Sequence, residues 1–193
     1  MVLKLFLNNV AQAFRETGNP IAENISEMIL QLEIGPNIHS NAQLTTPLSL
    51  KQALSAPDCH VAAGQLNFIA DKLPWTSAKE FRVAPKSFRG NYHFVPIVGP
   101  KDLILSDQFR TGIFLQDADT YYPSHMHEAE ELYLPLSGTA LWQKDNNEFS
   151  ATKSGQLIHH LPYQPHATWT KDAPMLAVWA WVGNLSPDTY SYL

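Results

Sequence analysis

One short segment, residues 121–138 (YYPSHMHEAEELYLPLSG), concentrates side chains that can bind a metal ion or move a proton. His125 and His127 are separated by a single residue, and Glu131 and Tyr133 have the same spacing. Residues two apart in a β-strand point to the same face, so each pair projects to one side of its strand. The intervening residues either continue the strand or form a tight turn, and both geometries can bring the two pairs together.

A second segment, residues 155–169 (GQLIHHLPYQPHATW), adds His166 at the start of another β-prone run. A neighbouring strand lies ~4.8 Å away, so this histidine can complete a site with the first segment. Three imidazoles and one carboxylate suit Fe2+, Mn2+, Zn2+, Ni2+ or Co2+ and leave coordination positions open for substrate. We therefore expect one divalent transition metal per chain, held by His125, His127, Glu131 and His166.

Other polar residues in and near these segments are not predicted metal ligands. Glu128 and Glu130 are expected to form a solvated edge, and His93 is expected to be structural. His159 and His160 precede the second segment's first proline, and either of them can face the cavity.

The elements that position these residues are predicted to be β-strands. From residue 81 onward, short β-prone runs alternate with Gly, Pro, Asp and Asn. The runs are 92–98, 102–107, 109–116, 131–138, 139–143, 155–160, 166–170 and 175–182. Regular short strands with frequent turns are typical of an antiparallel sandwich or barrel. The sequence DNNE at 145–148 predicts a hairpin turn.

Residues 1–80 instead show helical periodicity. Apolar stripes predict one helix that ends near Gly18 and a second that runs from Pro20 to Gly35. A short helix follows through Leu54, and Asp58 is expected to cap another. The stripes can cover a barrel formed by residues 81–193, in one structural unit, or can form a dimer interface. Both a monomer and a homodimer therefore remain open.

Composition limits the possible partners and compartments. The 193-residue chain has a formal net charge of −5 and no basic cluster, which argues against nucleic acid as a partner. No run approaches the ~20 apolar residues that span a bilayer, so no membrane partner is expected. Cys59 is the single cysteine, which excludes an intrachain disulfide and a thiolate cluster for zinc. We expect a soluble, cytoplasmic protein that acts on a small molecule.

The order of the predicted ligands resembles the two motifs of the cupin superfamily. The first motif, H-x-H, three residues, E, six residues, G, is matched by His125, His127, Glu131 and Gly138. The second, G, several residues, P, three residues, H, is matched by Gly155, Pro162 and His166. Asp119 replaces the usual glycine ahead of the first histidine, and Thr170 replaces a late asparagine. The resemblance implies a mainly β cupin barrel, a double-stranded β-helix or jelly roll, with an N-terminal α-helical cover.

Within the cupins, the chain is similar to the small bacterial lyases that cleave dimethylsulfoniopropionate (DMSP) to dimethyl sulfide and acrylate. The features in common are Tyr133 two residues after Glu131, the helical N-terminal part, the length and a tryptophan-rich last strand. The layout matches over most of the chain, and the specific motifs lie within residues 121–181. This resemblance implies a carbon–sulfur lyase in which Tyr133 is the base and Tyr122 also contributes to catalysis.

Elementary chemistry agrees with such a role for tyrosine. The protons beside the DMSP carboxylate are weakly acidic, so β-elimination needs a base. Tyrosine has an ordinary pKa near ~10, and an adjacent divalent cation favours its phenolate. The same cation can bind the substrate carboxylate as a Lewis acid. The sulfonium group lacks hydrogen-bond donors, so aromatic faces are its natural partners. Trp179 and Trp181 are the predicted contacts, and Tyr163 and Trp142 are weaker candidates for the same role.

Two other functions fit the same ligands. The first is another metal-dependent cupin enzyme, such as a dioxygenase or a sugar isomerase. The second is a cupin that binds a small molecule without converting it. The absence of a helix-turn-helix signal weakens a transcription-factor version of this second reading.

Overall fold

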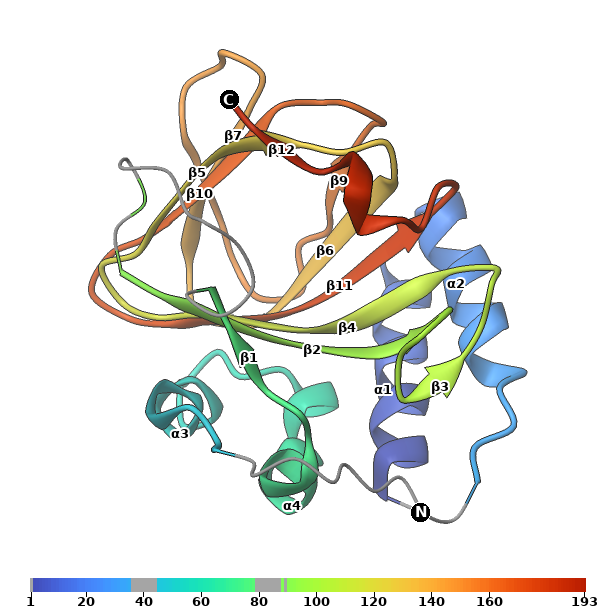
Figure 1. Ribbon diagram of the computed structural model, residues 1–193. Helices are drawn as coiled ribbons and strands as arrows, with labels where there is room; N and C mark the ends of the chain where they lie inside the picture. The colour runs from blue at the N-terminus through green and yellow to red at the C-terminus, as the bar shows by residue number, and fades with distance from the viewer. Residues whose placement is uncertain (1, 36–44, 79–87, 89) are drawn as a thin grey trace.

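The computed structural model describes residues 2–35, 45–78, 88 and 90–193, and within them two sheets face each other (Figure 1). Their strand pairs are antiparallel except for β2 with β3, which is parallel. The larger sheet has the order β1-β2-β4-β11-β6-β9, with β3 paired to β2. Its strands are β1 (Thr76–Ser77), β2 (Tyr92–Gly99), β3 (Ile104–Leu105), β4 (Arg110–Gln116), β6 (Glu130–Ser137), β9 (Ile158–His160) and β11 (Met175–Val182).

The smaller sheet has the order β12-β5-β10-β7-β8. Its strands are β5 (Tyr121–Met126), β7 (Ala140–Lys144), β8 (Ser150–Thr152), β10 (His166–Thr170) and β12 (Ser191–Tyr192). From β4 onward the chain passes repeatedly from one sheet to the other, as a double-stranded β-helix requires. The predicted cupin architecture is confirmed.

The central strands of the larger sheet, β4, β6 and β11, are buried on both faces. In β11, Val178 and Ala180 pack on the side of the helices, whereas Trp179 and Trp181 point between the two sheets. Such a strand reads as a nearly continuous apolar run, because neither face meets water. The alternation places aliphatic side chains towards the helices and aromatic side chains in the interior.

The N-terminal helices cover the outer face of the larger sheet (Figure 1). They are α1 (Val2–Glu16), α2 (Pro20–Leu30), α3 (Leu48–Leu54) and α4 (Leu66–Ile69), with 3-10 turns at Val61–Ala63 and Ala70–Lys72. Phe6, Val10 and Phe14 of α1 belong to the same buried cluster as Ile113 of β4. The side chain of Asn19 caps α2 by accepting hydrogen bonds from the backbone N–H groups of residues 21 and 22.

Several local predictions are confirmed and others are wrong. The first three helices are present, but α2 ends at Leu30 and not at the predicted Gly35, and the DNNE turn joins β7 to β8. Asp58 caps no helix, because its carboxylate accepts the backbone N–H of Gly138 at 3.2 Å, and His60 caps the following 3-10 turn instead. The run at 102–107 pairs only over Ile104–Leu105. The expected boundary between residues 80 and 81 lies outside the described residues.

The described helices include none that is both long enough and apolar enough to cross a membrane.

Candidate functional site

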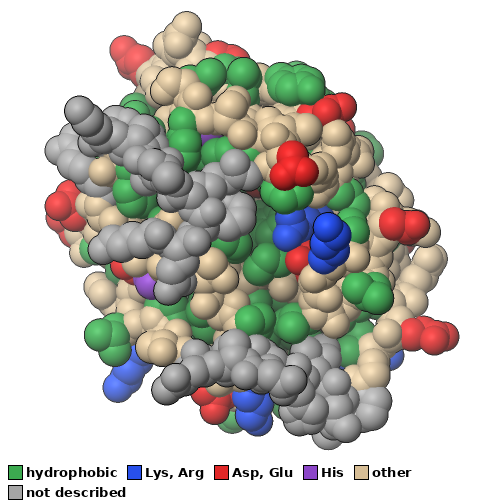
Figure 2. Space-filling view, in the orientation of Figure 1, with side chains coloured by type: hydrophobic (Ala, Val, Ile, Leu, Met, Phe, Trp, Pro, Cys, Tyr) green, Lys and Arg blue, Asp and Glu red, His purple; other side chains and the backbone are tan. Residues whose placement is uncertain are grey.

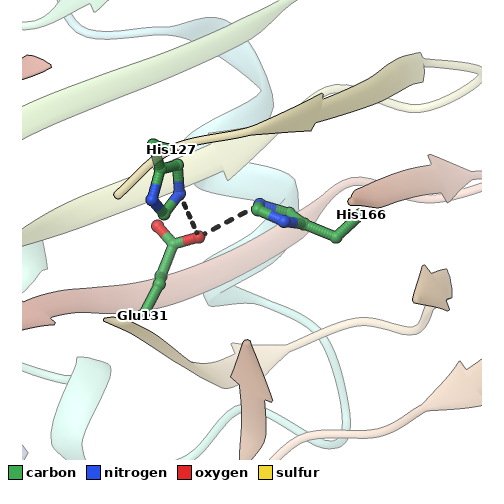
Figure 3. Close-up of side chains that lie close together, drawn as sticks. All are labelled: His127, Glu131 and His166. Atoms are coloured by element: carbon green, nitrogen blue, oxygen red, sulfur yellow. Dashed lines mark hydrogen bonds and ion pairs between the residues drawn. The ribbon is translucent and has the colours of Figure 1, made fainter. Parts of the chain in front are cut away.

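Two histidines and one glutamate converge between the sheets (Figure 3). His127 directly follows β5, Glu131 lies near the start of β6, and His166 opens β10. The Nε2 atoms of both histidines lie 3.2 Å from Oε2 of Glu131. All three side chains are buried, and their potential ligand atoms lie within 4.8 Å of one another.

Backbone carbonyl groups orient both imidazoles. Nδ1 of His127 donates to the carbonyl of Ala129 at 2.9 Å, and Nδ1 of His166 donates to the carbonyl of Gln164 at 2.8 Å. A carbonyl can only accept, so the proton resides on Nδ1 and Nε2 faces the cluster. Metal-binding histidines are typically held in this way.

The carboxylate of Glu131 is held by charge and by a tryptophan. Burial raises the pKa of Glu131, but His127 and His166 outweigh it and hold that pKa well below its usual range. Burial opposes protonation of His127, but Glu131 outweighs burial and raises the pKa of His127. Nε1–H of Trp181 donates to Oε1 of Glu131 at 2.6 Å. The three residues thus form a buried group in which Glu131 is ionised and fixed in orientation.

This donor set fits a divalent transition metal. Two imidazole nitrogens and one carboxylate oxygen suit Fe2+, Mn2+, Zn2+, Ni2+ and Co2+ alike, and they leave positions for further ligands. A cation among these atoms would neutralise the charge of Glu131 and accept the lone pairs of both Nε2 atoms. The arrangement supports a metal at this place without selecting one.

His125 lies beside this cluster and outside the group of three. Its ring centroid is 4.1 Å from that of His166 and 6.3 Å from that of His127. Its imidazole stacks against Tyr122 at 4.2 Å and against Tyr190 at 4.9 Å. Burial, followed by the proximity of His166, lowers its pKa well below the usual value. His125 is therefore neutral, and its role as a fourth ligand stays a prediction.

The cluster opens onto an aromatic cavity of about 80 Å³. Its aromatic wall is formed by Tyr92, Phe114, Tyr122, Tyr133, Trp179 and Trp181. Figure 2 shows one face of the molecule, where hydrophobic side chains gather in a hollow with basic and acidic side chains at its edge. A space of this size and lining suits a small molecule with an apolar or cationic part.

Tyr133 and Tyr122, the two predicted catalytic tyrosines, both line this cavity. Tyr133 lies in register with Trp179 of β11, and its ring packs against Phe114 at 5.6 Å. Burial, and then the charge of Glu131, raise the pKa of Tyr133 well above its usual value. The phenolate of Tyr133 is thus disfavoured unless a cation lies close to it.

The predicted substrate contacts separate in the structure. Trp179 and Trp181 line the cavity, and the indole N–H of Trp181 donates a hydrogen bond to Glu131. Tyr163 is 52% exposed and lies outside the cavity lining, so the structure does not bring its ring to this cavity, and its contact with substrate stays a prediction. Its position follows from its backbone, because its N–H donates to the carbonyl of His127 at 2.8 Å and its φ is 58°.

The remaining polar residues near the site differ in burial, and the adjacent His159 and His160 point to opposite faces of β9. His160 is fully buried and stacks on the ring of His166 at 4.0 Å. His159 points the other way and contacts Glu130 at 2.7 Å, where both side chains are partly exposed. Glu128 is partly buried and accepts a hydrogen bond from Asn184 at 2.7 Å.

Several cavity residues were not predicted from the sequence, and Arg110 and Tyr190 are two of them. Arg110 begins β4, and Tyr190 lies in the C-terminal segment, between the 3-10 turn Pro187–Thr189 and β12. Neither is part of a ligand motif. Arg110 is aligned with Trp181, and that tryptophan with Glu131, but this register is known only from the structure, so no spacing in the sequence pointed to the arginine.

Comparisons with known proteins agree with this geometry. The profile of the DMSP lyase family matches residues 23–177. The lyase DddQ of Ruegeria pomeroyi is 33% identical over 89 residues, which are 46% of this chain and 44% of DddQ. The putative lyase DddL of Cereibacter sphaeroides is 27% identical over 164 residues, which are 81% of this chain and 68% of DddL.

A solved structure has the same fold over nearly the whole chain. A chain from the crystal structures of the DMSP lyases RdDddP and RnDddQII superposes with a TM-score of 0.70 at 18% identity, and the match covers 97% of both chains. The match to DddQ of R. pomeroyi spans less than half of that relative's length. The family profile, by contrast, extends over most of the present sequence and includes the His127–Glu131–His166 cluster. The chain belongs to the dimethylsulfoniopropionate lyase family.

Proposed function

We propose that this protein is a metal-dependent lyase that cleaves DMSP to dimethyl sulfide and acrylate, with Tyr133 as the base. The observation that carries the proposal is that Tyr133 lines one aromatic cavity together with His127 and Glu131, two members of the His127–Glu131–His166 cluster. Family membership supports the substrate, because the family is named for this reaction.

The base is assigned from position. Tyr133 stands two residues after Glu131 on β6, so both side chains project to the cavity face of the strand. Its phenolate oxygen removes a proton from the carbon next to the substrate carboxylate. The C–H electron pair forms the new carbon–carbon double bond as the Cβ–S bond breaks. Sulfur leaves with the electrons of that bond as neutral dimethyl sulfide, and acrylate remains.

The metal would be held by His127, Glu131 and His166, with His125 adjacent to them. A divalent ion bound there supplies Lewis acidity and favours a phenolate on the neighbouring tyrosine. Trp181, on β11, orients the carboxylate of this site. Its N–H donates to Oε1 of Glu131, so Oε2 remains next to Nε2 of His127.

The aromatic wall is suited to the cationic end of DMSP. A sulfonium group offers no hydrogen-bond donor, and the faces of aromatic rings attract cations by ~0.5–2 kcal/mol each. Trp179 and Trp181 meet edge to face, with centroids 5.6 Å apart. Tyr122 lies on the opposite sheet and lines the same cavity. These rings would hold the dimethylsulfonium group and exclude water from the reacting carbon.

The test is headspace detection of dimethyl sulfide from the purified protein incubated with DMSP and added Fe2+, Mn2+ or Zn2+. We expect dimethyl sulfide and acrylate in equal amounts, in the absence of oxygen as well as in its presence. A Tyr133→Phe variant prepared identically is the control for background decomposition. Failure to release dimethyl sulfide with any of these metals would refute the proposed function.

A further inference from the structure

We propose that Arg110 makes the cavity selective for zwitterions, because its guanidinium repels a cation that brings no carboxylate of its own. This inference rests on the proposed function for the identity of the substrate, and it leaves the substrate carboxylate at the His127–Glu131–His166 cluster. Among the described residues that line the cavity, Arg110 is the only lysine or arginine. Aromatic walls attract sulfonium and ammonium ions of many kinds, so a positive charge among them changes which ligands the cavity retains.

Arg110 lies where the cavity opens to solvent. The lining residues that are only partly buried are Phe94, Pro96, Arg110, Pro187 and Tyr190, whereas the others, including those of the cluster, are buried. A ligand that enters from solvent passes between these residues. It therefore meets the charge of the arginine before it reaches the cluster.

The guanidinium of Arg110 is fixed with its charge towards the cavity. Nε donates to Oδ2 of Asp102 at 2.8 Å, and Nη2 donates to Oδ1 of the same carboxylate at 3.0 Å. Arg110 lines the cavity, whereas Asp102 does not. Their side chains are 18% and 7% exposed, and charges buried to this extent are screened less by water and salt than surface charges. A ligand in the cavity is thus closer to the cationic member of the pair.

The backbone is shaped to hold this pair. Asp102 lies in the turn between β2 and β3, and a side chain at Gly99 would overlap both the Asp102 carboxylate and the stem of Arg110. Glycine at this position lets the acidic residue approach the start of β4. The ion pair is thus a built feature of the cavity edge.

Arg110 and the cluster occupy separate parts of the cavity. Arg110 is the cross-strand partner of Trp181 on β11, and that tryptophan is the partner of Glu131 on β6. Two strand spacings put roughly 10 Å between the backbones of Arg110 and Glu131. The guanidinium carbon lies 5.7 Å from the centroid of the Trp179 ring, within the ~6 Å at which an aromatic ring attracts a cation. Trp179 thus already has a cation beside its ring, which disfavours a second one there.

The charge of Arg110 acts differently on a zwitterion and on a simple cation. In a zwitterion, the repulsion of the sulfonium group is offset by attraction of the carboxylate, whereas a cation without a carboxylate meets only the repulsion. Proteins gain specificity from such repulsive elements as well as from attractive contacts. The aromatic wall alone is then insufficient to retain a cation, and binding requires a carboxylate that the cluster can accept.

The probe for this inference is trimethylsulfonium, the cationic end of the substrate without its carboxylate. Its binding to the purified protein is measured by calorimetry and by quenching of tryptophan fluorescence, with metal content determined for every variant. We expect Arg110→Gln to bind trimethylsulfonium at least about tenfold more tightly than the wild type, because the repulsion is removed. KM for DMSP should change by less than about threefold, since two opposing contributions are lost together. A misfolded variant would lose binding, so a gain in affinity does not arise from damage to the fold.

Three further variants separate charge from other effects. Arg110→Lys keeps the positive charge and should bind trimethylsulfonium within about threefold of the wild type. In Asp102→Asn/Arg110→Gln no unpaired carboxylate is left to attract the probe, and a gain of at least about fivefold should persist. Arg15→Gln, an exposed change on α1, is the control and should behave as the wild type. Wild-type affinity in the double variant, or an equal gain in Arg110→Lys, overturns the inference.

The two proposals fail in different ways. If the wild-type protein releases no dimethyl sulfide but the double variant gains affinity for trimethylsulfonium, the reaction is wrong and the role of Arg110 stands. If dimethyl sulfide is released and the double variant gains no affinity, the reaction stands and the role of Arg110 is wrong.

Discussion

The hydroxyl groups of Tyr122 and Tyr190 lie 2.6 Å apart, although the two residues are 68 positions apart in the chain. The bond joins β5 to the C-terminal segment, where β12 pairs with β5 and the N–H of Leu193 donates to the carbonyl of Ser124. The two tyrosine rings enclose the imidazole of His125. The end of the chain is thus a wall of the cavity.

We expect Tyr190→Phe to lower the melting temperature by about 2–4 °C. The substitution keeps the ring on His125 but removes the hydroxyl partner of buried Tyr122, a loss of about 1 kcal/mol of unfolding free energy. Tyr121→Phe, on the neighbouring and partly exposed position of β5, is the matched control. The melting temperatures are measured by circular dichroism. Equal values for the two variants would show that the hydrogen bond between the hydroxyls of Tyr122 and Tyr190 contributes nothing to stability.

Metal binding is expected to need the histidines of the buried cluster and not histidines elsewhere in the chain. His127→Ala and His166→Ala should each lose most of the metal found by elemental analysis, because each removes one of three converging ligand atoms. His159→Ala removes a partly exposed histidine that contacts Glu130, and its metal content should match the wild type.

His125→Ala then decides whether a third histidine supplies a fourth ligand to the metal. A weakened metal site would assign His125 to the ligands. Unchanged metal content would assign it to the cavity wall between Tyr122 and Tyr190.

Trp181→Phe is expected to weaken metal affinity by about 10–100-fold. The indole N–H of Trp181 holds Oε1 of Glu131, and loss of such an orienting bond typically has this effect. Trp179→Phe removes the neighbouring indole. Among the described residues, that indole makes no hydrogen bond to Glu131, so this variant should retain wild-type affinity for the metal. Titration with Co2+, followed by its visible absorption, measures both. Equal affinities would contradict the orienting role of Trp181.

Tyr133→Phe is expected to reduce turnover of DMSP by about 100-fold or more, the contribution typical of a positioned acid or base. The ring and its packing against Phe114 remain, so metal content and melting temperature should stay close to those of the wild type. Dimethyl sulfide release under saturating DMSP is the measurement. Full activity in this variant would eliminate Tyr133 as the base.

The two glycines of the cupin motifs are expected to differ in importance. Both Gly138 and Gly155 have positive φ, so Gly→Ala at either position costs about 1 kcal/mol in backbone strain. A methyl group at Gly138 would in addition overlap the backbone of Pro174, whereas nothing lies near Gly155. Urea denaturation should therefore show Gly138→Ala to be less stable than Gly155→Ala by at least about 1 kcal/mol. Equal midpoints would contradict the packing argument.

Much of the fold was predictable from local patterns. Spacing of two residues placed Trp179 and Trp181 on one face of a strand, and apolar stripes located the first helices, because these features depend only on the period of each element. The order of histidines, glutamate and glycines indicated the cupin barrel through its resemblance to the two motifs of that superfamily. Spacing could not foresee that His125 lies outside the converging group, since that depends on how β5, β6 and β10 are aligned.

The sequence by itself determined the barrel, its helical cover and the residue types available for a metal site. Only the tertiary structure decided which of them meet. In it, Tyr163 lies at the surface, the indole N–H of Trp181 donates to Glu131, and Arg110 and Tyr190 line the cavity. The physical reason is that side-chain direction follows from the period of each strand, whereas contact between strands depends on their register and on the paths of the connections between them.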